Sequence, residues 1–142
     1  MSAASDYLEN KLLDHVLKFG NGSVTVGSGA GYAPPATVYV ALFTANTGLE
    51  TNSPSAEVTT VSTAYARQTI TFATASGGSS ASNATVTFPA ATANYGTVTH
   101  VALMDASTAG NVLFHGAVTT SKLIETGDTF QISSGNLTIS LA

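Results

Sequence analysis

The sequence predicts a mainly β protein: an antiparallel β-sandwich or jelly-roll-like barrel of about seven to eight strands, preceded by an N-terminal amphipathic helix. Three observations support this prediction. From residue 37 onward, apolar residues alternate with Thr and Ser in short stretches, which is the period of a strand with one buried face. Clusters of Gly, Ser, Asn and Asp separate these stretches and leave no helices that could connect parallel strands. The length of 142 residues fits one domain.

The predicted helix occupies residues 1–20, which differ in composition from the rest of the chain. Five of the twelve charged residues lie between positions 1 and 18, in a stretch without Gly, Pro or Thr. Ser5 or Asp6 can cap the N-terminus of this helix, and Gly20 can end it. Its apolar residues follow at three- and four-residue spacing and form one face that needs a cover, either the protein's own sheet or a neighbouring subunit: Leu8, Leu12, Leu13, Val16, Leu17 and Phe19.

A Gly/Ser/Pro-rich arm, residues 21–36, connects the helix to the β-sandwich domain, residues 37–142. In several stretches of this domain one register is apolar and the other carries Thr or Ser, so one sheet face is expected to be core and the other a hydroxyl-rich surface. Residues 57–62 are a candidate for a further strand. The predicted strands are 37–44, 66–73, 83–88, 97–104, 111–118, 129–133 and 136–141.

The stretch 37–44 is different because both of its registers are apolar. This pattern predicts a central strand that is covered on both sides, with the N-terminal helix as the candidate cover for one of them. One register holds Val38, Val40 and Leu42, and the other holds Tyr39, Ala41 and Phe43.

The charge balance of the chain excludes several classes of partner. Four Lys and Arg stand against eight Asp and Glu, giving a formal net charge of −4. Such a surface lacks the cations that neutralise phosphate backbones or anionic lipid, so we expect no nucleic-acid partner and no membrane partner. Neither a signal peptide nor a membrane span is recognisable, which predicts synthesis as a soluble chain in the cytoplasm. The absence of Cys excludes disulfides, thiolate catalysis and Cys-based zinc sites.

No constellation of residues predicts catalysis, a metal site or a cofactor. His100 and His115 fall in neighbouring strands and could form half of a metal site, but only His15 remains as a third histidine. The carboxylates of the domain lie mostly in turns, which does not favour an acid–base pair. We therefore expect a protein that is not an enzyme and has no cofactor.

Aromatic side chains near loops leave two interpretations open. Tyr32, Tyr65 and Tyr95 could form a sugar-stacking platform, or they could pack loops onto the sheet with their hydroxyls exposed.

The only arginine of the chain, Arg67, precedes a predicted strand. A single guanidinium at such a position can anchor two strands or two subunits. Together with the helix face, it completes the predicted interface: Leu8, Leu12, Val16, Phe19 and Arg67.

Five strings resemble, in this order, a family of small virion structural proteins of tailed bacteriophages that is often labelled tail-fibre-like. They are residues 5–17 (SDYLENKLLDHVL), 34–44 (PPATVYVALFT), 65–72 (YARQTITF), 96–106 (GTVTHVALMDA) and 114–122 (FHGAVTTSK). The resemblance implies a structural component of the virion and supplies no catalytic residues.

Two functions agree with the resemblance and with the residues. In the preferred one, the protein is a capsid decoration or cement protein, a homo-oligomer with a trimer favoured, whose helix binds the major capsid protein on the capsid surface. Its small size and lack of a repetitive shaft favour this location. In the alternative, it is a tail or tail-fibre component whose loops 49–56 or 76–82 bind host-surface glycans. A β-sandwich enzyme is a third class, for which the acid–base pair is missing.

Overall fold

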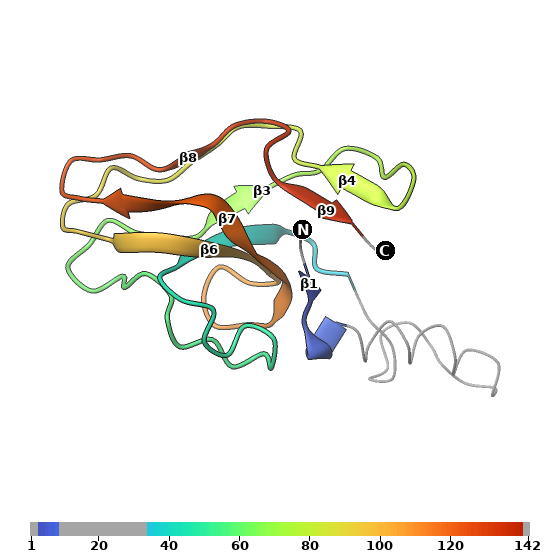
Figure 1. Cartoon of the computed structure of the whole chain (residues 1–142), viewed down its shortest axis with the longest axis horizontal. Coiled ribbons are helices and arrows are strands. Elements are labelled where there is room, and N and C mark those ends of the chain that lie inside the picture. The colour runs from blue at the N-terminus through green and yellow to red at the C-terminus, as the bar shows by residue number, and fades with distance from the viewer. Residues whose placement is uncertain (1–2, 9–33, 141–142) are drawn as a thin grey trace.

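The computed structural model describes residues 3–8 and 34–140 (Figure 1). This part of the chain is mainly β, as the sequence predicts. Its strands are β1 (Ala3–Ala4), β2 (Val38–Phe43), β3 (Gln68–Ile70), β4 (Ser79–Ala81), β5 (Val86–Thr87), β6 (Gly96–Met104), β7 (Val112–Ile124), β8 (Gln131–Ile132) and β9 (Thr138–Ser140).

The strands form a sandwich-like arrangement. Five of them make an antiparallel sheet in the order β1-β7-β6-β2-β3, and the others form two antiparallel pairs, β4-β9 and β5-β8. The two pairs lie above the sheet in Figure 1. The long β6–β7 hairpin supplies the middle of the sheet, because nine and thirteen residues belong to its two strands.

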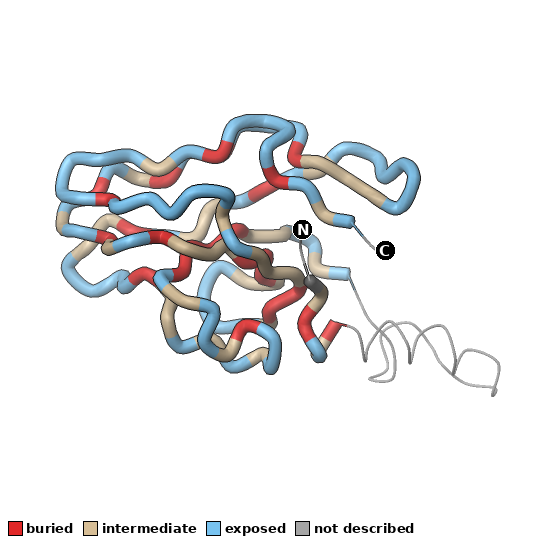
Figure 2. The backbone as a smooth tube through the Cα atoms, viewed as in Figure 1, coloured by how far each residue is buried: buried red, intermediate tan, exposed pale blue. Residues whose placement is uncertain are grey.

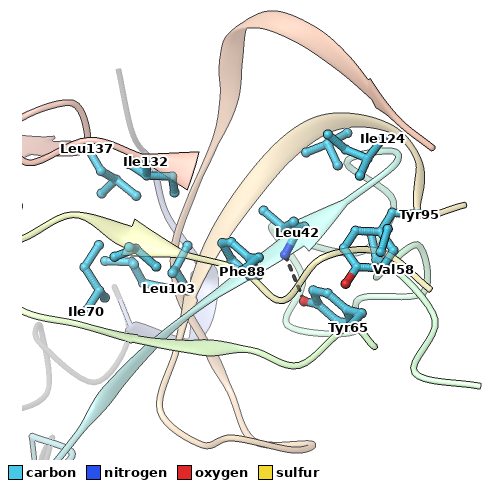
Figure 3. Packing of buried hydrophobic residues seen from close by; sticks show 14 of the residues in the cluster. Leu42, Val58, Tyr65, Ile70, Phe88, Tyr95, Leu103, Ile124, Ile132 and Leu137 are labelled. Atoms are coloured by element: carbon cyan, nitrogen blue, oxygen red, sulfur yellow. Dashed lines mark hydrogen bonds between the residues drawn. The ribbon is translucent and has the colours of Figure 1, made fainter. Parts of the chain in front are cut away.

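The main core lies between the five-stranded sheet and the two pairs. Leu42 of β2 and Ile124 at the end of β7 are fully buried, and Phe88, directly after β5, is 1% exposed. Figure 3 shows these side chains converging with residues from both layers. The alternating register predicts this arrangement, since Val86 and Phe88 turn inward while Thr87 between them is exposed.

Strand β2 is buried on both faces, as its doubly apolar sequence predicts. Its second face carries Ala41 and Phe43, which pack in a separate cluster with Leu49. Among the described residues, the segment 44–57 contributes to the cover of this face through Leu49, which is fully buried; the predicted helix beyond Leu8 lies outside the described residues. Leu49 is the one large apolar residue in the sequence of that segment, which is why the segment gives no signal of a covering role.

The N-terminus begins as a strand and not as a helix. Ala3 and Ala4 pair with His115 and Phe114 of β7. Helical conformation starts at Asp6, and the Ser5 hydroxyl accepts a hydrogen bond from the Leu8 amide at 3.4 Å, so Ser5 is the N-cap. The predicted helix beyond Leu8, and the predicted arm as far as residue 33, lie outside the described residues.

Three strand predictions need correction. Strand β7 continues to Ile124, past the predicted end at 118, because its Thr- and Ser-rich second half pairs along β6. Strand β4 occupies residues 79–81, which the polar sequence places in a loop. Residues 57–62 make only one bridge in the described structure, between Glu57 and Phe43, instead of a full strand.

Gly48 is the glycine whose replacement the fold tolerates least among those at described turns. Its φ is +74°, and a Cβ at this position would lie 1.9 Å from the Ser53 carbonyl oxygen. We expect Gly48→Ala to lower the free energy of unfolding by about 3 kcal/mol, because strain and a backbone clash add. Gly127→Ala is the matched control, since its φ is +93° but no atom lies within 4 Å of the Cβ position. That variant should lose about 1 kcal/mol of the free energy of unfolding, measured in urea, from backbone strain alone. Equal losses in the two variants would show that the clash at Gly48 adds nothing.

Candidate interaction site

The Arg67 side chain is largely buried and forms a bidentate ion pair with Glu57. Its Nε donates to Glu57 Oε1 at 2.8 Å, and its Nη2 donates to Glu57 Oε2 at 2.7 Å. The Arg67 side chain is only 6% exposed and that of Glu57 is 26% exposed. The hydrogen bond to Glu57 is the main reason that the pKa of Arg67 is raised above its usual value.

The same guanidinium holds the loop that connects β6 and β7. Nη1 of Arg67 donates to the carbonyl oxygens of Ala106 at 2.8 Å and Ala109 at 2.7 Å. Within this loop, the Asp105 carboxylate accepts hydrogen bonds from the backbone and side-chain amides of Asn111 and so connects the two ends of the loop. Arg67 therefore joins three segments of its own chain, which is the strand-anchoring interpretation of this residue.

Tyr65 extends the network to the edge of β2. Its hydroxyl accepts from the Leu42 amide at 3.0 Å and donates to Glu57 Oε1 at 2.9 Å. Strand β3 pairs with β2 only as far as Val40. Beyond that point on the same edge, the Tyr65 hydroxyl accepts the hydrogen bond of the Leu42 amide in place of a β3 carbonyl (Figure 3). Beyond it, Leu42 accepts from Val58, and residues 56–58 continue along the same edge.

Burial is the main cause that raises the pKa of the Tyr65 phenol well above 10, and the negative charge of Glu57 acts in the same direction. A folded-state pKa above the unfolded value means that stability is complete below pH 10 and decreases as pH rises beyond it. We expect this one group to remove about 1.4 kcal/mol per pH unit above pH 10. Urea unfolding between pH 8 and pH 11 should show a smaller slope for Tyr65→Phe than for wild type. Parallel slopes would contradict this assignment.

Of the three tyrosines considered for a sugar-stacking platform, the two in the described residues, Tyr65 and Tyr95, are buried and form no exposed platform. Tyr65 and Tyr95 are 3% and 4% exposed, and their rings meet edge to face with centroids 5.7 Å apart. Their hydroxyls are bonded internally, that of Tyr95 to the Pro89 carbonyl at 2.9 Å. The packing interpretation is correct for these two, although it wrongly expects exposed hydroxyls. Tyr32 lies outside the described residues.

The N-terminal segment, residues 3–8, docks onto the edge of β7. The Ser5 amide donates to the Leu113 carbonyl at 3.2 Å, and the Ser5 hydroxyl donates to the Val112 carbonyl. The Asp6 amide donates to the Glu50 carbonyl at 3.0 Å. Leu8 is 2% exposed and belongs to the main core, so this member of the predicted interface packs within its own chain. Leu12, Val16 and Phe19 lie outside the described residues.

A groove of about 260 Å³ lies beside β7. Its lining is mixed: Phe114 and Val118 of β7 and Phe130, Leu137 and Ile139 from the opposite layer share it with polar residues that include His115, Thr119, Asn136 and Thr138. Next to it, β7 runs from two buried residues, Val112 and Leu113, through mostly half-buried ones to the exposed residues 119–123 (Figure 2). Among the described strands, only β1 pairs with the outer edge of β7, and it does so at Phe114 and His115.

The histidines do not assemble a metal site in the described part of the chain. His115 Nε2 lies 2.8 Å from Glu50 Oε2, and His100 Nδ1 lies 2.9 Å from the Thr99 hydroxyl. Within residues 3–8 and 34–140, no group of three His, Asp or Glu side chains could hold a metal ion. Across these same residues, no helix has the length and apolar character needed to cross a membrane.

The two loops proposed for host contact differ in their exposure. Segment 49–56 is anchored, because the Asn52 side chain donates to Asn111 at 2.8 Å and accepts from the Val112 amide at 2.7 Å. Segment 76–82 contains β4 and an exposed turn at Gly77 and Gly78, both with positive φ, at the end of a small hairpin. The hairpin is thus the freer of the two surfaces.

Comparison with known proteins gives one informative result. A family model described as Podophage GP4 fiber I protein gp80 matches residues 3–140. A search of curated proteins finds no match. The match includes the N-terminal segment as well as the whole β-domain.

Proposed function

The chain belongs to the family of the podophage GP4 fiber I protein gp80, and from this premise we propose that it is a non-enzymatic structural component of a bacteriophage tail fibre. Membership makes the chain a virion structural protein, which agrees with the resemblance noted in its sequence. The observation that carries the proposal is the extent of the match, which leaves out only two residues at each end. The proposed partners are other virion proteins and further copies of this chain.

The chemistry of the domain supports a role in protein contact. The strongest polar cluster, formed by Glu57, Tyr65 and Arg67, is used to hold segments of the same chain together. Surface available for partners is instead rich in Thr and Ser, as on the second half of β7. Such neutral surfaces associate through area and shape, and several weak contacts become strong when copies assemble.

The experiment that tests the proposal is quantitative mass spectrometry of purified virions after physical separation of heads and tails. A tail-fibre component should appear in the tail fraction at a few to a few dozen copies per particle. Hundreds of copies in the head fraction would overturn this proposal and establish capsid decoration, the second candidate.

A variant pair tests how the protein attaches to the particle. Deleting residues 1–20 is too coarse, because Leu8 belongs to the core and its loss would damage the domain. Leu12→Ser with Val16→Ser keeps residues 3–8 and changes only the predicted apolar helix face. Lys11→Ser with Lys18→Ser is the matched control on the predicted polar face. We expect the first pair to reduce incorporation into virions at least tenfold and the control to leave it unchanged; equal incorporation would exclude this face as the attachment surface.

Binding to the host is tested separately on the purified protein. Saturable binding to host cells or surface polysaccharide would assign a receptor-binding role to the fibre. The Gly77–Gly78 hairpin is the loop to substitute first, because it is more exposed than segment 49–56. An absence of saturable binding would restrict the role to fibre structure.

A further inference from the structure

The N-terminal segment, residues 3–8, is held like a peptide bound at the edge of a sheet. Ala3 and Ala4 add a short antiparallel strand to β7, Ser5 caps the following turn, and Leu8 enters the main core. Backbone pairing combined with one buried side chain is the mode by which sheet edges recognise extended peptides. The socket, defined here as the β7 edge at residues 112–115, the Glu50 carbonyl and the core around Leu8, is therefore a built recognition site.

None of the contacts of residues 3–8 depends on which copy of the chain supplies them. The described contacts of the segment with the socket are hydrogen bonds to Leu113, Val112 and Glu50, the pairing with β7, and the packing of Leu8, Ala4 and Tyr7 against the main core. The same contacts form equally well when a second copy supplies the segment, which is the condition for exchange of an element between protomers.

The length of chain between the segment and the domain allows such an exchange. About 25 residues, 9–33, connect Leu8 to β2 through Pro34, and they include the Gly-rich stretch from Gly20 to Gly31. A chain of that length spans about 37 Å as one straight helix and about 80 Å when extended. A domain of this size is about 35 Å across, so the segment can reach the socket of an adjacent copy.

We propose that, in the assembled protein, residues 3–8 of one copy occupy the socket of a second copy of this chain. This inference rests on the proposed homo-oligomeric fibre. Exchange ties neighbouring copies together without any new interface residue, because the contacts already present in one chain are distributed over two. A tether of this length gives an effective concentration of about millimolar for its own socket, and a neighbour in an oligomer provides a comparable one.

Engineered cysteines can distinguish the exchanged from the closed form, because the native chain has none. Ala4 lies opposite Phe114, and the Ser5–Leu113 hydrogen bond makes this the closer, non-hydrogen-bonded kind of pair, which suits a disulfide. In the full-length double variant Ala4→Cys/Phe114→Cys, oxidation should yield chains linked to one another on a non-reducing gel. Only internally linked single chains would overturn the proposal.

A mixing experiment gives an independent reading. When the single variants Ala4→Cys and Phe114→Cys are refolded together, exchange should produce a mixed disulfide dimer as the main linked species. Mixing Ala4→Cys with Val61→Cys is the matched control, because Val61 is 75% exposed and belongs to none of the described strands. Equal yields from the two mixtures would contradict exchange.

A second cysteine pair covers the case in which Phe114→Cys weakens the core. Ala3 pairs with His115, which is half-buried, so Ala3→Cys/His115→Cys probes the same pairing and spares Phe114. These tests use purified protein, so their failure leaves the proposed tail location intact. Conversely, finding the protein in the head fraction would overturn the proposed function but would leave the outcome of the cysteine cross-linking unchanged.

Discussion

Replacing Arg67 with Ala should lower the free energy of unfolding by about 3 kcal/mol, because it leaves Glu57 and two loop carbonyls without their donor. The Arg67 side chain is 6% exposed, so water replaces little of the lost bonding. For a domain of this size the loss corresponds to roughly 10 °C in melting temperature. Urea and thermal unfolding of the purified variant measure both quantities.

Conservative variants separate the contributions of charge and geometry at this site. Arg67→Lys keeps the positive charge but cannot form the bidentate pair. We therefore expect it to lose about half as much free energy of unfolding as Arg67→Ala. Glu57→Gln combined with Arg67→Ala should cost less than the sum of the single changes, because both remove the same pair. A loss below about 1 kcal/mol in Arg67→Ala would show that the network contributes little to stability.

Phe88→Ala should lower the free energy of unfolding by about 4 kcal/mol, the largest single effect that we expect. The Phe88 side chain is 1% exposed at the centre of the main core. It stacks on Tyr65 with centroids 6.1 Å apart and meets Phe130 edge to face at 5.9 Å. Truncation leaves a cavity between the two layers, because rings from different segments cannot close it without moving the strands.

Two controls accompany the measurement on Phe88. Phe88→Leu keeps most of the volume and should lose roughly 1.5 kcal/mol. Val61→Ala changes a side chain that is 75% exposed, and its unfolding energy should stay within about 0.5 kcal/mol of wild type. Equal losses in free energy of unfolding for Phe88→Ala and Phe88→Leu would mean that the two layers move together and fill the cavity. That result would contradict a closely packed core.

The fold class was predictable because its signals are local. The double apolar register of residues 37–44 predicts a strand buried on both faces, and β2 is one. The Ala109-Gly110 turn predicts the β6–β7 hairpin, and both residues have positive φ. Strand β4 escaped prediction because Ser79, Ser80 and Ala81 carry no apolar signal, and its pairing with β9 lies about 60 positions away in the chain.

The site was less predictable because it depends on which segments meet. The sequence predicts Arg67 as an anchor of two strands or two subunits without indicating its partners, because Glu57 is ten positions earlier and the loop contacts are about 40 positions later. The small number of charged residues could have indicated this network. In a chain with only four Lys and Arg, Glu57 and Arg67 lie on either side of Tyr65 in the sequence and are therefore candidates for an ion pair near that ring. The docking of Ala3 and Ala4 had no signal, since alanine favours helix and is depleted in strands.

The position of β1 also determines when this sheet can be completed during synthesis. The Ser5 hydroxyl bonds to a carbonyl 107 positions later in the chain. At elongation rates of about 5–20 residues per second, the ribosome takes roughly 5–20 s to make the intervening chain. Strand β1 therefore leaves the ribosome well before its partner edge in β7 exists. During that interval on a polysome, the nascent N-terminus can meet the finished domains of neighbouring chains.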